Sequence, residues 1–303
     1  MLETPRQMGF FIGKRRRPCT FETSALDISA PVSYTEWMAA AKPEQTIAAI
    51  YSTLAGAWGR QHWWPAQSRF EVIVGAYLTQ NTSWTNVEIA MRKLRAARVL
   101  SVDGVRKIPV RKLEQLIRSS GYFRQKARKL KIFVRFLDRR YGGSLTRMFA
   151  QPTATLREQL LSLNGVGPET ADSILLYAGQ HPVFVIDAYT RRLAVRHGIL
   201  DEKATYEDFR VLFERALRDA EPVTAVAVRL DTNSAGAAHR PSRMSLTKRV
   251  PLAQVFNEMH GLIVSAGKQY CLKSKARCDA CPLGPLLRLD GRMLNTGMNA
   301  LQQ

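Results

Sequence analysis

The sequence lacks any apolar run that approaches the roughly 20 residues of a membrane-spanning helix. Its first residues, MLETPRQMGFFIGKRRR, also lack the order of basic, apolar and small residues that marks a signal peptide. It shows no internal repeat and no coiled-coil heptad. These absences argue against a membrane protein, a secreted protein and a repeat or coiled-coil protein. We therefore expect a cytoplasmic protein with no membrane partner.

The chain is short of acidic residues. Only 25 Asp and Glu stand against 45 Lys and Arg, which gives a formal charge of +20 and a pI of about 10.3. Residues 91–147 hold 18 of the basic residues and three acids, a net charge of +15. Like charges repel one another, so a segment with this excess of positive charge indicates a polyanionic partner. Nucleic acid is favoured over a membrane surface. With 46% hydrophobic residues in 303, the chain can also bury a sizeable core.

Cysteine is rare as well. The four cysteines are Cys19 and, near the C-terminus, Cys271, Cys278 and Cys281. Disulfide frameworks belong to oxidising compartments, and nothing in the sequence directs the chain to one. Three cysteines this close together are instead typical of a metal or cluster site.

Apolar residues recur at helical spacing through most of the chain, for example in residues 44–58, so the sequence predicts an all-α fold. The segment FEVIVGAYL, residues 70–78, fits a strand or a buried helix by pattern alone, and its helical neighbours favour the helix. Residues 1–42 are predicted to form a basic, partly ordered extension. Residues 221–249 are rich in small and polar residues without periodicity, which indicates a flexible insertion.

Two predicted helices are joined by a short turn in LNGVGPETA, residues 163–171. The stretch from Asn164 to Gly167 cannot continue the first helix, and Pro168 suits the first position of the next, where a missing N–H costs nothing. The pattern predicts a helix-hairpin-helix. Gly165 and Gly167 let the backbone approach a partner closely, and the N–H groups that open the second helix suit a phosphate oxygen. Taken alone, such a turn is more often structural than functional.

Beyond the hairpin, an apolar run leads into VIDAYTRR, residues 185–192. Together with YLTQNTSWTNV (77–87), GYFRQKA (121–127) and HGLIVSAGKQYC (260–271), these motifs resemble the endonuclease III superfamily of DNA glycosylases, over about residues 44 to 287 except the insertion. The resemblance implies two helical domains with a central DNA-binding cleft: a helical barrel of residues 69–183, and a second domain of residues 43–68 and 184–290. It also implies a monomer in the cytoplasm, associated with the nucleoid, whose partner is double-stranded DNA containing a damaged base.

The resemblance assigns roles to individual residues. An aspartate at the position of Asp187 faces the flipped nucleotide in this superfamily, which makes Asp187 the catalytic candidate; a helix N-cap is the competing role, and the two can coexist. Gln80 matches the residue that enters the duplex where the base has left. The hairpin and its surroundings imply DNA contacts at Gly165, Gly167, Thr170, Lys126 and Arg191.

Two departures from related enzymes select the type of reaction. Bifunctional members carry a hairpin lysine that forms a Schiff base, and Glu169 stands at that position here. The resemblance therefore favours a monofunctional enzyme in which Asp187 stabilises the sugar cation and directs water. Adenine-excising relatives place a glutamate where this chain has Gly75 and Ala76, so the substrate should be a base that leaves without being protonated.

Alkylated purines meet this condition, because methylation at a ring nitrogen leaves the base cationic. Trp63, Trp64 and Trp84 lie where the resembling 3-methyladenine glycosylase branch has pocket aromatics, which hold a cation well, and GVGPETAD is similar to the hairpin of that branch. Trp63 and Trp64 could equally be core residues. Glu169 could face the base, or could only satisfy the N-terminus of the second hairpin helix.

Cys271, Cys278 and Cys281 follow the spacing of the [4Fe–4S] loop in this superfamily, but Leu287 stands where the fourth cysteine would be. Cys19 could complete the set only if the N-terminal extension folded back. A cluster with a foreign ligand and a loop that has lost its cluster both stay open, and the reaction itself requires no cofactor. His260, alone on its helix, is expected to be a hydrogen-bonded core residue.

Two alternatives stand beside the monofunctional alkylpurine glycosylase. One is a bifunctional glycosylase and AP lyase that acts on oxidised pyrimidines, with a lysine such as Lys268 as the nucleophile. The other is a non-catalytic DNA-binding protein that keeps the hairpin and the basic face.

Overall fold

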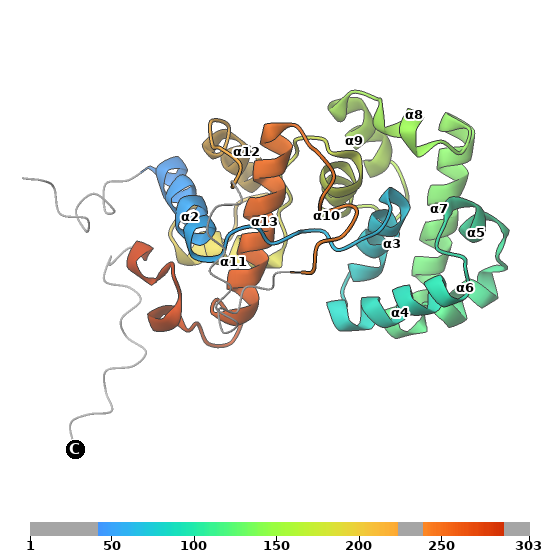
Figure 1. The fold of residues 1–303 in the computed structure, drawn as a ribbon, viewed down its shortest axis with the longest axis horizontal. Coiled ribbons are helices and arrows are strands. Elements are labelled where there is room, and N and C mark those ends of the chain that lie inside the picture. Colours follow the sequence, from blue (N-terminus) through green and yellow to red (C-terminus); the bar gives the residue numbers. More distant parts are fainter. Residues whose placement is uncertain (1–41, 224–238, 288–303) are drawn as a thin grey trace, which may run out of the picture.

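The computed structural model describes residues 42–223 and 239–287, and the all-α fold is confirmed for them (Figure 1). The α-helices are α2 (Pro43–Trp58), α3 (Arg69–Thr79), α4 (Trp84–Ala96), α5 (Val102–Lys107), α6 (Val110–Leu116), α7 (Phe123–Tyr141), α8 (Leu145–Phe149), α9 (Thr153–Leu161), α10 (Pro168–Ser173), α11 (Ala188–Arg196), α12 (Tyr206–Ala216) and α13 (Pro251–Gln269). Short 3₁₀ turns, η1 (Arg118–Ser120), η3 (Cys278–Ala280) and η4 (Gly284–Leu286), and a π-helix, η2 (Ile174–Gly179), complete them. None of the helices in these two ranges is long and apolar enough to cross a membrane.

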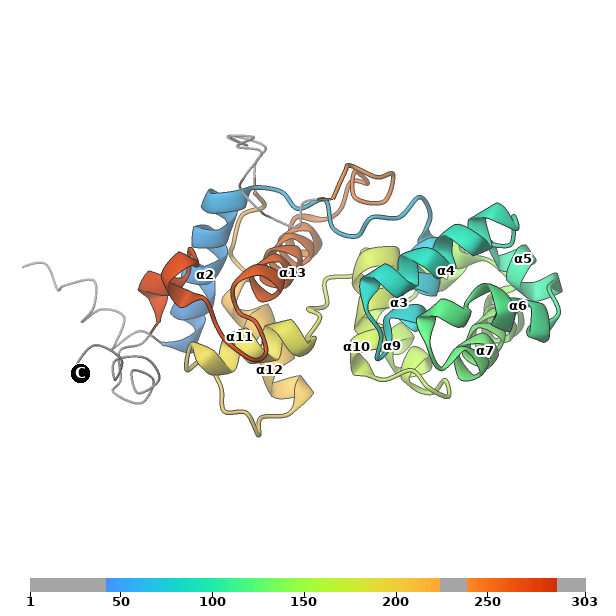
Figure 2. The same ribbon diagram turned by 90° about the horizontal axis from the view of Figure 1, so that it is seen from below.

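The helices gather in two groups that lie side by side along the long axis of the molecule (Figures 1 and 2). One group holds α3 to α10 with η2, and the other holds α2, α11, α12 and α13. Although α2 precedes the first group in the chain, it packs against α12 and α13 of the second. This arrangement supports the predicted division into two domains, whose exact bounds remain a proposal. The predicted N-terminal extension lies outside the described residues apart from position 42.

The segment FEVIVGAYL forms α3, so the helical prediction is confirmed. Ser68 caps this helix, because its side-chain oxygen accepts a hydrogen bond from the backbone N–H of Glu71 at 3.1 Å. Every residue from 70 to 78 is buried, and α3 contacts α4, α7, α10 and η2. A helix surrounded on all sides needs no polar face, which explains why its sequence pattern resembles that of a buried strand.

Part of the predicted flexible insertion is ordered against the segment that carries Trp63 and Trp64. The backbone N–H of Met244 donates to the carbonyl of Ala66 at 3.0 Å, and the hydroxyl of Ser242 donates to the carbonyl of Trp64 at 3.3 Å. Ser242 and Met244 are both buried. Residues 239–249 of the predicted insertion are thus held against this segment by hydrogen bonds and by the buried side chain of Met244, and the flexibility of the insertion stays a prediction. Residues 224–238 lie outside the described residues.

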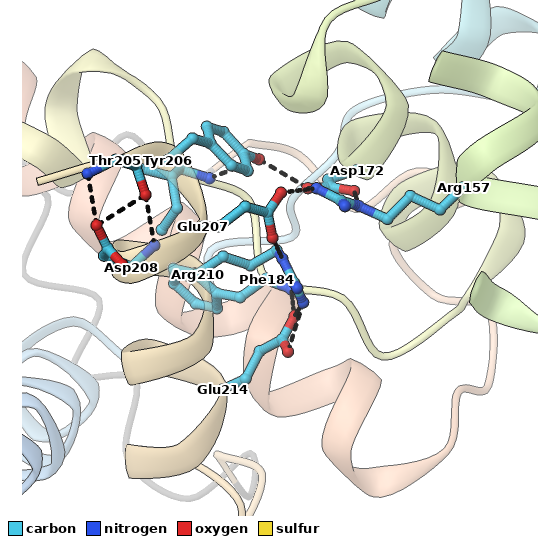
Figure 3. Close-up of polar contacts among 10 residues, drawn as sticks. Arg157, Asp172, Phe184, Thr205, Tyr206, Glu207, Asp208, Arg210 and Glu214 are labelled. Atoms are coloured by element: carbon cyan, nitrogen blue, oxygen red, sulfur yellow. Dashed lines mark hydrogen bonds and ion pairs between the residues drawn. The ribbon is translucent and has the colours of Figure 1, made fainter. Parts of the chain in front are cut away.

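A network of charged side chains joins the hairpin to α12 of the other group (Figure 3). Asp172 on α10 is fully buried, and its two oxygens accept hydrogen bonds from Arg157 of α9 at 2.7 and 3.1 Å. The hydroxyl of Tyr206 donates to the same carboxylate at 2.9 Å. Arg157 also pairs with Glu207 at 2.5 Å, and Arg210 bridges Glu207 and Glu214. The network fixes the hairpin helices against the second group.

We expect Asp172→Ala to destabilise the protein by about 3–5 kcal/mol, because it leaves Arg157 without the buried partner that compensates its charge. The measurement is the free energy of unfolding from denaturant titration. The matched control is Glu44→Ala, which breaks a surface ion pair with Arg215 and should cost below about 1 kcal/mol. Equal losses for the two variants would show that the network contributes no more than a surface pair.

Candidate active site

Asp187 lies where the buried run of residues 183–186 enters α11, and it is the N-cap of that helix. Its Oδ1 accepts hydrogen bonds from the backbone N–H of Thr190 at 2.8 Å and from the Thr190 hydroxyl at 3.0 Å. Its Oδ2 lies 3.6 Å from Nε2 of His260. The N-cap role is thus confirmed, and it uses only one of the two carboxylate oxygens.

Burial by itself would raise the pKa of Asp187, but the nearby His260 and the hydrogen bonds from Thr190 outweigh it and lower the pKa below its usual value. The carboxylate is therefore ionised at neutral pH. His260 is buried on α13, and its Nδ1 lies 2.7 Å from the hydroxyl of Tyr177 on η2. The expectation of a hydrogen-bonded core histidine is confirmed, and the structure adds that its second nitrogen faces the carboxylate.

Glu169, the second residue of α10, brings another carboxyl group to the same place. Its side chain is exposed to solvent, but protein surrounds the carboxyl group closely enough to hinder its ionisation. This partial desolvation and the negative charge of Asp187 raise the pKa of Glu169 to about 7. At neutral pH the two neighbouring carboxyl groups therefore differ in protonation: the carboxyl group of Asp187 is ionised, and that of Glu169 is about half ionised.

The three predicted pocket tryptophans form one cluster. The ring centroids of Trp63 and Trp64 are 5.3 Å apart, those of Trp64 and Trp84 are 5.1 Å apart, and Tyr177 packs 5.3 Å from Trp64. Trp63 and Trp64 are only 8% and 6% exposed, so much of each ring belongs to the core. Trp84 is half-buried, and its Nε1 donates to Glu88 at 2.8 Å. Of the three, Trp84 presents most surface to a ligand.

Gly75 explains how Trp64 fits into this cluster. A Cβ atom added at Gly75 would lie 3.0 Å from Cζ2 of Trp64, so the indole ring occupies the space that a side chain at position 75 would need. This is one of the two positions matched above to the acid of adenine-excising relatives. The structure therefore accounts for the missing acid, because an aromatic ring fills its place.

Gln80 links the end of α3 to the hairpin. Its Nε2 donates to the carbonyl of Gly165 at 3.1 Å and to the hydroxyl of Thr170 at 2.8 Å, while its Oε1 accepts from Lys129 of α7 at 2.8 Å. Gly165 has φ +82°, a left-handed conformation that favours glycine. The structure thus brings together Gln80, Gly165 and Thr170, all predicted to face DNA. Gly167 is the extended N-cap residue of α10 beside them.

This hairpin and the helices around it match a known family of repair proteins. Residues 74–219 match the model of the "HhH-GPD superfamily base excision DNA repair protein". Over 243 residues, the chain is 40% identical to the "Putative DNA repair glycosylase MJ1434" of Methanocaldococcus jannaschii, a match that covers 79% of this chain and 94% of that protein. The chain belongs to the HhH-GPD superfamily.

Solved structures agree with this assignment. The HhH-GPD protein described here is similar to the crystal structure of Helicobacter pylori 3-methyladenine DNA glycosylase (MagIII) bound to 1,N6-ethenoadenine, with 28% identity, a TM-score of 0.58, and coverage of 76% of this chain and 98% of that one. Its fold also resembles that of endonuclease III trapped in a covalent intermediate with DNA, at 21% identity and a TM-score of 0.58, over 81% and 95% of the chains. The protein is a DNA repair glycosylase of the HhH-GPD superfamily.

Two of the predicted DNA contacts have other roles in the fold. Lys126 is 1% exposed, and its Nζ donates to the carbonyls of Leu78 at 2.9 Å and Ser120 at 2.6 Å. The prediction that Lys126 contacts DNA is therefore wrong, because its ammonium group is inside the first group of helices. Arg191 donates to the carbonyl of Ala204 at 2.8 Å and lies over the ring of Phe209. A phosphate contact of Arg191 stays a prediction.

Three residues that were not among the predicted site residues stand out in the structure: Tyr122, Lys129 and Tyr177. Tyr122 is 66% exposed with φ +44°, at the N-terminus of the same helix α7 that contributes Lys129. An exposed aromatic residue in the GYFRQKA turn was a visible signal. Lys129 itself was hidden among many basic residues of the segment, and Tyr177 among the apolar residues of the second hairpin helix. Lys129 stands out by its hydrogen bond to Gln80 and Tyr177 by its contacts with His260 and Trp64, whereas Tyr122 stands out by its exposure.

Cys271, Cys278 and Cys281 line one pocket together with Leu287, as the spacing predicts. In residues 42–223 and 239–287, no three His, Cys, Asp or Glu side chains are close enough to hold a single metal ion. Cys19 lies outside these ranges. A cluster in this pocket would be held by the three thiolates and would be remote from the chemistry at Asp187, and whether the chain binds one stays a proposal.

We expect the carboxyl group of Glu169 to titrate near pH 7, and to titrate at a lower pH in Asp187→Asn, because the neighbouring negative charge is then absent. The measurement is NMR titration of protein labelled with 13C-glutamate, in which Glu169→Gln identifies the signal. The control is Asp103→Asn, which removes an exposed carboxylate of the remote helix α5. An unchanged pKa in Asp187→Asn would show that the two carboxyl groups do not interact.

Proposed function

We propose that this protein is a monofunctional DNA glycosylase that hydrolyses the N-glycosidic bond of alkylated purines in double-stranded DNA. The observation that carries the proposal is the pair of carboxyl groups. Asp187 is ionised, and Glu169 occupies the hairpin position at which the resembling bifunctional enzymes have their lysine. A carboxylate cannot form a Schiff base, whereas an ionised aspartate can stabilise a sugar cation and direct water onto it.

The reaction needs no acid when the base is already cationic. As the bond between the sugar C1′ and the base nitrogen breaks, its electron pair moves to the base and neutralises the positive charge. The Oδ2 atom of Asp187 makes no hydrogen bond to Thr190 and is available to the positive charge that develops on the sugar. The oxygen of a water molecule then bonds to C1′, and the proton that this water releases passes to the solvent. Neither a metal ion nor a cofactor enters these steps.

The residues around Asp187 support a cationic purine as the leaving base. A cation is attracted to the face of an indole, and Trp84 presents the most surface of the cluster. Above pH 7, Glu169 adds a second negative charge beside Asp187. The similar Helicobacter pylori enzyme is named a 3-methyladenine DNA glycosylase. The position next to Trp64 that could have held an acid is a glycine, which is consistent with a base that leaves unprotonated.

DNA binding is proposed to use the hairpin and the segment with net charge +15. The turn at Gly165 and the N-terminus of α10 present backbone N–H groups, which suit a phosphate. Gln80 would enter the duplex at the vacated position. We propose that the protein acts as a monomer in the cytoplasm, at the nucleoid, on double-stranded DNA containing a damaged base.

The deciding experiment is the release of free bases from methylated duplex DNA. The wild type should release 3-methyladenine, and strand breaks should appear only after alkali cleaves the abasic sites. Asp187→Asn should be slower by about 100-fold or more, because the amide cannot stabilise the sugar cation. Asparagine is as good an N-cap as aspartate, so α11 remains capped and the loss reports the chemistry. Intact DNA binding without base release would favour the non-catalytic alternative or another lesion.

One observation supports the bifunctional alternative. Lys268 of α13 lies 6.0 Å from the ring centroid of Trp63 and is close enough to Asp187 to interact with its charge. Burial lowers the pKa of this lysine despite the attraction of Asp187, which increases the fraction of neutral, nucleophilic amine. An amine beside the catalytic aspartate is what a lyase reaction would need.

The two reactions differ in whether a covalent intermediate forms. With DNA containing an abasic site or an oxidised pyrimidine, we expect no borohydride-trapped complex and no strand cleavage without alkali. Lys268→Gln should therefore leave the strands as uncut as the wild type does. A trapped complex that disappears in Lys268→Gln, but persists in the control Lys203→Gln, which changes an exposed lysine, would establish the lyase instead.

A further inference from the structure

Asp187 has one carboxylate oxygen that the N-cap leaves free. Both hydrogen bonds from Thr190 end on Oδ1, so they hold that oxygen while Oδ2 can still swing about it. A carboxylate stabilises a cation well only when its charged oxygen is already aimed at the place where the positive charge develops. Holding Oδ2 in place therefore requires a second partner besides Thr190.

His260 is the residue that lies next to this oxygen. Its side chain is only 4% exposed, and the centroid of the Trp63 ring lies 5.9 Å from that of the imidazole. The Nε2 atom lies 3.6 Å from Oδ2 of Asp187 and makes no hydrogen bond within the part of the chain that the structure describes. A buried polar atom left without a partner costs about 1–3 kcal/mol. The fold thus keeps an unsatisfied ring nitrogen beside the free carboxylate oxygen.

The other ring nitrogen of His260 decides what Nε2 presents to Asp187. Nδ1 lies 2.7 Å from the hydroxyl of Tyr177, and burial raises the pKa of this tyrosine well above its usual value, so the hydroxyl keeps its proton. In a neutral ring, a proton on Nδ1 would leave the lone pair of Nε2 against an ionised carboxylate, which is repulsive. The favoured neutral form therefore accepts at Nδ1 from Tyr177 and carries its proton on Nε2. A cationic ring also has a proton on Nε2, so an N–H lies toward Asp187 in either charge state.

We propose that His260, oriented by Tyr177, is the positioning residue of Asp187 and places Oδ2 for the sugar cation. The inference rests on the catalytic role of Asp187 proposed above, and it assigns two further residues a part in the same reaction. In this role neither side chain contacts the sugar or the base. Tyr177 belongs to η2 and His260 to α13, so elements of both helix groups fix the direction of one oxygen.

The separation of 3.6 Å between Nε2 and Oδ2 suits this task. A short, charge-assisted hydrogen bond would draw negative charge from Oδ2, and the sugar cation needs that charge. An N–H slightly beyond hydrogen-bond length still attracts the oxygen, but leaves most of its charge available. His260 also helps to keep Asp187 ionised, since burial would raise the pKa of this carboxyl group and His260 is the main influence that lowers it.

The first test measures the contact without any substrate. In protein labelled with 15N-histidine, NMR should show a proton on Nε2 of His260, whose signals are those that disappear in His260→Phe. In protein labelled with 13C-aspartate, His260→Phe should raise the pKa of Asp187, because the influence that opposes burial is then absent. Asp187→Asn identifies the carboxyl signal. A ring proton on Nδ1 alone, or an unchanged pKa of Asp187, would overturn the inference.

The second test is the rate of base release from methylated duplex DNA in a single turnover. Tyr177→Phe removes one oxygen atom and keeps the ring that packs 5.3 Å from Trp64, so the fold and the affinity for DNA should be unchanged. The rate should fall about 10-fold, because one hydrogen bond that orients His260 is lost. The control is Tyr77→Phe, since this buried hydroxyl makes no hydrogen bond to any described residue, and its rate should equal that of the wild type. Equal rates for the two variants would contradict the inference.

Variants at position 260 separate this inference from the proposed function. His260→Phe should slow base release by up to about 100-fold at unchanged DNA affinity, the loss expected when a catalytic group is misplaced by about 1 Å. His260→Gln has an amide N–H to take the place of Nε2–H and should recover part of the rate. A His260→Gln variant no faster than His260→Phe would show that the site needs the packing of the ring and not its N–H.

The comparison with Asp187→Asn decides which proposal fails. If Asp187→Asn is slow and His260→Phe releases bases at the wild-type rate, the positioning role is wrong and the proposed function stands. If both variants release bases at the wild-type rate, the catalytic role of Asp187 is wrong as well. Circular dichroism of each variant checks that the helices are intact.

Discussion

An ionised carboxylate placed away from water needs hydrogen-bond donors close by, and at Asp187 this requirement draws on several helices. Thr190 supplies two hydrogen bonds from the first turn of α11. His260 comes from α13, and Tyr177, on η2 of the other helix group, holds its ring. Both groups therefore contribute to the surroundings of this carboxylate, the first group indirectly through the hydrogen bond of Tyr177 to the ring of His260. The same arrangement that keeps the carboxylate ionised also places it where the two groups join.

The sequence was sufficient for the parts of the structure that depend on local chemistry. Helical periodicity, the glycines of the hairpin and Pro168 each act through the backbone within a few residues, so α9, the turn and α10 could be predicted. The ambiguity of α3 was settled by its neighbours. The N-cap role of Asp187 could be predicted from its position before α11, whereas its catalytic role rests on a motif and a resemblance and stays a proposal.

The rest depended on contacts between distant segments, which have no local pattern. Lys126 looked like one more member of a basic surface, but it bonds to two carbonyl groups in the interior. Residues 239–249 lack periodicity because backbone and serine hydrogen bonds hold them against Ala66. His197 has no motif around it, and only the fold shows that it shares a pocket with three cysteines. In each case the deciding partner is far away in the sequence.

The contacts of Gln80 have a consequence for how such a protein would search DNA. In the free protein, its amide group makes three hydrogen bonds, to Gly165, Thr170 and Lys129. Entering a duplex would require the side chain to exchange all of them for contacts with bases, so the exchange is nearly balanced rather than downhill. On intact, well-stacked DNA the Gln80 side chain would keep its hydrogen bonds to the hairpin, and the protein could diffuse to another site. The exchange would be completed only where a base pair is already weakened. The internal hydrogen bonds of Gln80 would thus limit its insertion to such base pairs.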